Sequence, residues 1–176
     1  MSELIFQKLS ESDFSSLYPS IIESLKADEQ DSVSDEALNK FELSKYPMKR
    51  VMNDIKNESS AFYLVKSDDK TIGFLLMNCK GLESTVKENN VLEIDLLYIL
   101  KEFRGNGFGT EIFQKTLDLS KQCNAQHLWV SVKESNEKAI NFYHHLGMRK
   151  FATRLKDFQG EKYNDLLLKI KTNRNN

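Results

Sequence analysis

The sequence is poor in cysteine and has no long apolar run. Its two cysteines, Cys79 and Cys123, belong to no metal-spacing motif, so reduced, buried thiols are expected rather than a disulfide or a metal site. The longest fully apolar run is Leu96 to Leu100, whereas a membrane-spanning helix needs about 20 such residues. The first residues do not read as a secretory signal. These absences predict a cytoplasmic protein with no membrane partner.

The sequence also lacks a strong excess of either charge. Its net charge is −1, so there is no basic surface of the kind that binds nucleic acid. The charges are unevenly divided, because residues 1–40 hold nine acidic residues and three lysines, or 9 − 3 = 6 net negative charges. The rest of the chain then carries −1 + 6 = +5. Either the acidic front attracts a cationic amine, or it is a solvated loop.

The apolar fraction of 40% and the charged fraction of 29% predict an ordinary globular domain over residues 1–176, with a frayed tail at 171–176. Apolar periodicity predicts helices at 11–26, 35–46 and 48–57, in the stretch that ends at Ser120, and at 136–146. A kink or break is expected at Pro19. Strands are predicted at 3–9, 61–66, 71–80, 91–99, 127–133, 148–158 and 163–170. The order β-α-α-β-β-β-α-β-α-β-β indicates the mixed α/β (α+β) class, a single domain whose sheet of about seven strands is flanked by helices.

A glycine-rich turn joins strand 91–99 to the helix that follows it. The turn reads Arg104-Gly105-Asn106-Gly107-Phe108-Gly109-Thr110, and its glycines allow positive φ angles and close approach of a ligand. A helix that begins at such a turn directs unpaired N–H groups and its positive dipole end at one point, which suits a phosphate or pyrophosphate. A dinucleotide fingerprint would need glycine in place of Thr110, and the Gly-Lys-Ser/Thr of a nucleoside-triphosphate loop is missing.

Two ordered motifs carry a resemblance to a known family. Arg-x-x-Gly-x-Gly, at Arg104, Gly107 and Gly109, resembles the acetyl-CoA-binding motif of the GCN5-related N-acetyltransferase (GNAT) family. Further on, residues 132–148 resemble that family's Val-x-x-x-Asn-x-x-Ala-x-x-x-Tyr-x-x-x-Gly-Phe, with Met148 in place of the phenylalanine. The resemblance is firm over residues 91–150. The predicted order of elements also matches the family's order.

The resemblance implies transfer of an acetyl group from acetyl-CoA to an amine, without a metal. The amides from Gly105 to Thr110 would hold the pyrophosphate, and the strand edge at Leu97–Ile99 would pair with pantetheine. Asn136 could both cap its helix and bond pantetheine. The cofactor-binding residues expected on this basis are Leu97, Tyr98, Ile99, Arg104, Gly105, Asn106, Gly107, Phe108, Gly109, Thr110, Asn136 and Tyr143.

The resemblance also suggests how protons move. Tyr143 is the candidate general acid for the leaving thiolate, since a thiol and a tyrosine titrate near about 8.5 and about 10; the alternative is a core tyrosine. Glu93 and Asp95 share one face of their strand, and Glu93 is the preferred base, although both could be structural carboxylates. The expected partners are acetyl-CoA and a small-molecule or peptide amine, with a homodimer left open. The rival function is a non-catalytic acyl-CoA-binding or sensing module.

Overall fold

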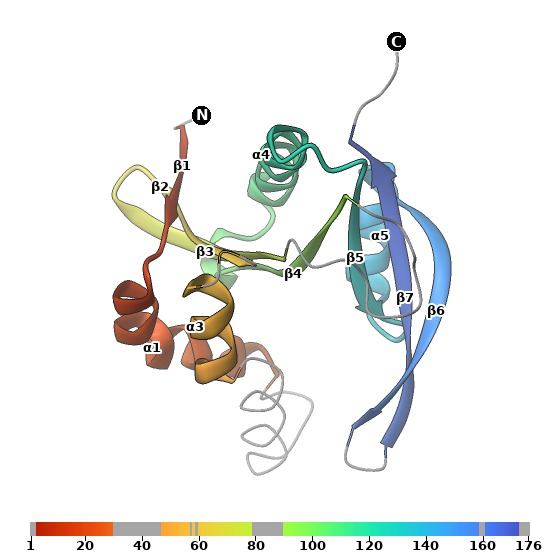
Figure 1. Cartoon of the computed structure of the whole chain (residues 1–176), viewed down its shortest axis with the longest axis horizontal. Coiled ribbons are helices and arrows are strands. Elements are labelled where there is room, and N and C mark those ends of the chain that lie inside the picture. Colours follow the sequence, from red (N-terminus) through yellow and green to blue (C-terminus); the bar gives the residue numbers. More distant parts are fainter. Residues whose placement is uncertain are drawn as a thin grey trace. The chain divides into compact units, whose positions relative to one another are not determined.

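The computed structural model describes residues 3–29, 47–56, 58, 60–78, 90–158 and 161–172. Its helices and strands are labelled in Figure 1. In chain order they are β1 (Leu4–Lys8), α1 (Glu11–Glu29), α3 (Met48–Lys56), β2 (Ser60–Ser67), β3 (Lys70–Asn78), β4 (Val91–Ile99), the 3-10 helix η1 (Lys101–Phe103), α4 (Phe108–Gln122), β5 (His127–Lys133), α5 (Glu137–His145), β6 (Arg149–Phe158) and β7 (Glu161–Lys171).

The strands form a seven-stranded sheet in the order β1-β2-β3-β4-β5-β7-β6. The β1–β2, β2–β3, β5–β7 and β6–β7 pairs are antiparallel. In contrast, Val91–Ile94 of β4 pairs in parallel with His127–Val130 of β5. A parallel pair needs a crossover connection, which α4 supplies. The prediction of a mixed sheet of about seven strands is therefore confirmed.

The chain divides into two compact units. The first contains Met1–Asn78 and Leu96–Gly109, and the second contains Cys79–Asp95 and Thr110–Asn176. Both β4 and α4 contribute residues to each unit. The single domain predicted from the sequence stays a prediction.

In the first unit, α1 and α3 bury apolar side chains together with those of β2 and β3. Phe14 belongs to this core, with its ring centroid 4.9 Å from that of Phe62. The core residues are Leu9, Phe14, Ile21, Val51, Phe62, Leu64, Phe74 and Leu76. The helix α1 begins with a reciprocal cap, because Ser10 Oγ accepts from Asp13 N and Asp13 Oδ2 accepts from Ser10 N. The hydrogen bonds from the Ser10 side chain and then its backbone lower the pKa of Asp13.

The second unit is built around β5, with β7 and β6 beside it in Figure 1. The buried stripe of α4 contains two polar residues whose hydroxyls are satisfied by the helix itself. Thr116 Oγ1 donates to Ile112 O at 2.7 Å, and Ser120 Oγ donates to Leu117 O at 2.6 Å. At the start of α5, Asn136 Oδ1 accepts from Ala139 N at 3.1 Å, which confirms a capping residue there.

Several local predictions need correction. The helix α1 continues through Pro19 to Glu29, so of the predicted kink or break the break is absent. Proline removes one helical hydrogen bond, while Phe14 and Ile21 on either side of it pack in one core. Lys171 ends β7, and Thr172 is buried with its N–H donated to Gln126 O, so these two residues do not belong to a frayed tail. Cys123 is exposed rather than buried. The predicted helix at 35–46 lies outside the described residues.

Candidate active site

The glycine turn has the backbone geometry expected of an anion site. Gly105 and Gly107 have φ angles of 79° and 83°, in the region that favours glycine. A Cβ built on either glycine would meet no atom within 4 Å, so the space above the turn is open. The helix α4 begins at Phe108, and its first N–H groups have no partner within the helix. The turn can therefore present several amide donors to one negatively charged group.

Arg104 organises this turn from its own side. Its Nε donates to Ile99 O at 2.8 Å, and its guanidinium carbon lies 5.2 Å from the centroid of the Tyr98 ring. Asn106 Nδ2 lies 3.3 Å from Phe103 O and 3.4 Å from Arg104 O. These contacts tie the turn to the end of β4. The part that Arg104 plays in cofactor binding stays a prediction.

The end of β4 is fixed by a residue that the sequence analysis did not single out. A Cβ on Gly73 of β3 would lie 2.1 Å from Tyr98 O and 3.2 Å from Ile99 Cα, so only glycine permits this approach of the two backbones. The Tyr98 hydroxyl donates to Ser24 O of α1, and its ring stacks on Phe74. Gly73 therefore sets the position of the strand residues expected to meet pantetheine. The sequence does contain one signal for this close approach, because a glycine inside a predicted strand often marks a place where another backbone comes near.

Tyr143 is buried on α5, with 6% of its surface exposed. Its ring centroid lies 6.3 Å from that of Phe113 and 5.1 Å from that of Phe142. Burial raises the pKa of its hydroxyl, so the group keeps its proton at neutral pH. Among the described residues, the structure gives this hydroxyl no hydrogen-bond partner. The side chain is held by packing, and its catalytic role stays a prediction.

Glu93 and Asp95 lie on β4, and both are half-buried. Glu93 is in register with Trp129 of β5. The two carboxylates and Thr110, Asn136 and Tyr143 belong to the second unit, whereas residues 97–99 and 104–109 belong to the first. The proposed site residues are thus divided between the two units.

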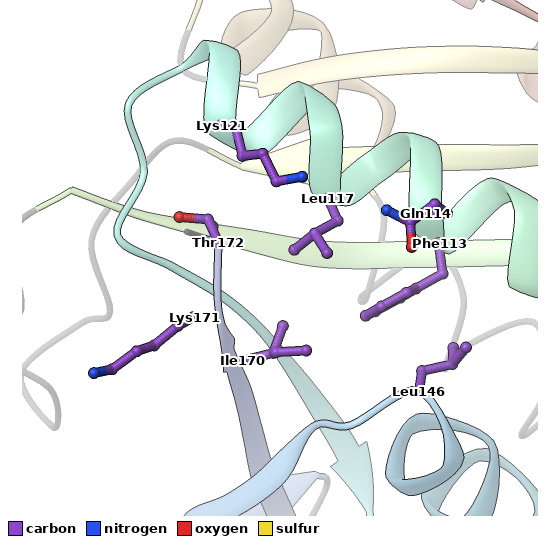
Figure 2. Close-up of a pocket in the computed structure, with 8 residues that line it drawn as sticks. All are labelled: Phe113, Gln114, Leu117, Lys121, Leu146, Ile170, Lys171 and Thr172. Carbon is purple, nitrogen blue, oxygen red and sulfur yellow. The ribbon is translucent and has the colours of Figure 1, made fainter. Parts of the chain in front are cut away.

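A cavity of about 450 Å³ lies in the second unit, and the ring centroid of its lining residue Phe113 is 6.3 Å from that of Tyr143. Figure 2 shows that α4 contributes four of its side chains and that the others come from Leu146 and the end of β7. The lining residues are Phe113, Gln114, Leu117, Lys121, Leu146, Ile170, Lys171 and Thr172. None of these lining residues was predicted as a site residue.

Two further observations concern metals and membranes. Across the described residues, no group of three or more His, Cys, Asp or Glu side chains is placed to hold a metal ion. None of the helices that the structure describes combines the length and the apolarity needed to cross a membrane. The acidic front at residues 1–40 is described only in part, because Asp31, Asp35 and Glu36 of its nine acidic residues lie outside the described residues.

Comparison with known proteins identifies the family. The sequence model of the acetyltransferase (GNAT) family matches residues 18–148. The chain therefore belongs to the GNAT family of acetyltransferases, as the two motifs indicated.

Individual relatives agree with this assignment. The chain is 29% identical over 116 residues to an uncharacterized N-acetyltransferase of Lactobacillus delbrueckii subsp. lactis, covering 66% of this chain and 67% of that protein. It is 29% identical over 112 residues to an N-alpha-acetyltransferase of Sulfurisphaera tokodaii, and this match covers 59% of this chain and 65% of that protein. Among the curated relatives it matches first, the chain spans from about two fifths to about two thirds of their length.

A solved structure confirms the fold. The PaiA N-acetyltransferase of Thermoplasma acidophilum, solved in complex with coenzyme A, superposes with a TM-score of 0.70 at 21% identity. The superposition covers 96% of this chain and 99% of that one. The mixed α/β architecture with its seven-stranded sheet is thus that of GNAT acetyltransferases.

Proposed function

We propose that this protein transfers the acetyl group of acetyl-CoA directly to a primary amine of a small molecule or peptide. The observation that carries this proposal is the glycine turn at the start of α4. Its two positive φ angles and the open space above them suit a pyrophosphate. Membership of the GNAT family then favours acetyl-CoA over other ligands that carry a pyrophosphate.

The residues of the turn and of β4 have distinct tasks in this proposal. The amides from Gly105 to Thr110 hold the pyrophosphate, and Arg104 keeps the turn in shape through Ile99 O. The backbone of Leu97–Ile99 pairs with the pantetheine arm, and its N–H groups can stabilise negative charge on the carbonyl oxygen under attack. Acetyl-CoA supplies an activated thioester. Asn136 uses Oδ1 for the helix cap, which leaves its Nδ2 group to donate to the arm.

Tyr143 is proposed as the proton donor and Glu93 as the proton acceptor. Burial raises the pKa of Tyr143, which makes proton donation to a thiolate less favourable, so the proposed role of this hydroxyl rests on the family motif and not on its pKa. Glu93, or Asp95 two residues further on, takes a proton from the ammonium group of the acceptor, directly or through water. The acetyl transfer then occurs within one complex, without an acetylated side chain.

The direct test measures thiol release from acetyl-CoA with a panel of amines. The panel contains polyamines, amino acids and peptides with a free α-amine, the last because the Sulfurisphaera relative is named an N-alpha-acetyltransferase. Tyr143→Phe keeps the ring contacts and removes the hydroxyl, so we expect kcat to fall about 10²–10⁴-fold while the Kd for CoA changes little.

Tyr63→Phe provides the matched control, because it removes a tyrosine hydroxyl from β2, far along the chain from the proposed site residues. We expect this control to keep the native kcat. A native kcat in Tyr143→Phe would leave Tyr143 as a core residue. Tight CoA binding without thiol release from any amine would favour a non-catalytic acyl-CoA-binding module.

A further inference from the structure

Two buried hydrogen-bond donors on one face of the second unit have no partner. Trp129 is 2% exposed, and its indole Nε1 makes no hydrogen bond within the described part of the chain. The Nε atom of Arg154 on β6 is also buried and makes no hydrogen bond within the described residues, although the Arg154 side chain as a whole is 22% exposed. An unpaired buried donor costs about 1–3 kcal/mol, so buried donors are normally satisfied. Two such donors indicate a ligand that accepts hydrogen bonds.

The Arg154 side chain is held in place by a polar network. Its Nη2 donates to Ser131 Oγ at 3.0 Å and lies 3.8 Å from Asp165 Oδ2. The Ser131 hydroxyl in turn donates to Asp165 Oδ2 at 2.7 Å. These contacts involve Nη2 and leave the buried Nε–H without a hydrogen bond among the described residues. Arg154 is therefore positioned before any ligand arrives.

Trp129 and Arg154 belong to the same face. Trp129 and Ser131 are two residues apart on β5, so both side chains point to one side of the sheet, and Ser131 binds Arg154. Trp129 also packs with Val91 and Leu167. The face also carries charges of both signs: Lys133 lies over the Tyr163 ring and Lys169 over the Phe151 ring, while Asp165 and Glu93 supply carboxylates. Two N–H donors, one of them on a guanidinium, match a carboxylate.

This donor pair lies beside the proposed base. Glu93 is the registered partner of Trp129 across the parallel β4–β5 pair, and adjacent strands are about 4.8 Å apart. Registered partners point to the same face of the sheet. A ligand with its carboxylate at Trp129 and Arg154 would therefore place an attached amine within reach of Glu93.

We infer that the acceptor is an amino acid, whose carboxylate is bound by Trp129 Nε1–H and by the Arg154 guanidinium. The binding of the carboxylate follows from the unpaired donors, and the role of its amine as acceptor rests on the proposed acetyl transfer. The inference narrows the substrate class from any primary amine to amines that also carry a carboxylate. Polyamines, which lack this group, would leave both donors unpaired.

A binding experiment tests the inference without turnover. Trp129 is the only tryptophan of the chain, so its fluorescence reports on this face alone. The native protein is titrated with glycine, L-leucine and L-lysine, and with the amide of each. We expect at least one amino acid to change the emission saturably, with a Kd about 10- to 100-fold lower than that of its amide. Arg154→Gln should remove this preference, whereas Val91→Ala, which disturbs the same packing without removing a donor, should keep it.

The activity assay adds a second measurement with the same pairs of compounds. We expect kcat/KM for the best amino acid to exceed that for its amide by about 10-fold or more, and Trp129→Phe to bring this ratio close to one. The inference would be overturned if the emission responded to no amino acid, or if it responded equally to an amino acid and its amide. It would also be overturned if the ratio of kcat/KM between amino acid and amide were unchanged in both Trp129→Phe and Arg154→Gln. Absence of thiol release with every amine would count against the proposed transfer, while the fluorescence titration would still decide whether a carboxylate binds.

Discussion

Replacing Gly73 with alanine should damage cofactor binding from a strand that contributes no predicted ligand contact. The added Cβ would lie 2.1 Å from Tyr98 O, whereas ordinary contact begins at 3.4 Å. The end of β4 must therefore move by at least 3.4 − 2.1 = 1.3 Å, or β3 must move away by the same amount. Tyr98 O belongs to the backbone and the position of a Cβ is fixed by its own backbone, so no side-chain rotation can relieve the clash.

The size of the effect follows from this displacement. Overpacking of this kind lowers the free energy of unfolding by about 1–3 kcal/mol, which a typical domain tolerates. A shift of about 1 Å at reacting groups can reduce activity about 10²-fold. Because Tyr98 lies in the stretch proposed to pair with pantetheine, we expect Gly73→Ala to fold, to bind CoA at least 10-fold more weakly, and to lose about 10²-fold in kcat/KM.

The assay separates binding from stability by comparison with a neighbour. Leu75 is fully buried two residues further along β3, so Leu75→Ala should lower the free energy of unfolding by about 2–5 kcal/mol without moving the Tyr98 backbone. Urea unfolding and calorimetric titration with CoA are measured on both variants. Equal losses of CoA affinity in the two variants, or native affinity in Gly73→Ala, would refute the role given to Gly73.

Two further predictions concern the turn and the pH dependence. Gly107→Asp places a side chain at a φ of 83°, which strains the turn although the Cβ meets no atom within 4 Å. We expect it to abolish CoA binding by calorimetry, and we expect the neutral Gly107→Asn, which has the same backbone strain, to weaken binding less; equal affinities would exclude a charge effect. Tyrosines in the unfolded chain ionise near a pKa of 10.0, and burial raises the pKa of Tyr143 above this value. The unfolded state then releases a proton that the folded state keeps, so the free energy of unfolding should fall above about pH 10 by up to about 1.4 kcal/mol per pH unit. Urea unfolding at pH 9, 10 and 11 should show a shallower decline in Tyr143→Phe.

Local patterns were sufficient for the central part of the fold. The bounds predicted for β4 and β5 are those observed, because β-favouring runs with clear turn signals define both strands. The predicted hairpin at 67–70 joins β2 and β3 as expected. The helix expected at 48–57 is observed as α3, and Asn136 caps α5. Each of these features depends on residues within a few positions of one another.

The features that the sequence did not reveal depend on residues far apart in the chain. Gly73 matters because of the Tyr98 backbone, 25 positions later. Ser131 and Asp165 are 34 residues apart and meet only because β5 pairs with β7. Periodicity places a side chain on a face, but it does not say which strand lies beside it. The polar network around Arg154 therefore required the strand order.

The position of β6 at the end of the sheet bears on how copies of this chain can associate. An edge strand exposes unpaired backbone groups that can join the sheet of another molecule. Here β6 is ten residues long and carries Leu155, which is 64% exposed. The strand also carries Arg149, Lys150, Arg154 and Lys156 against the single acid Asp157. Two copies that met through this edge would oppose like charges, so the strand's own charge disfavours a continuous sheet between molecules.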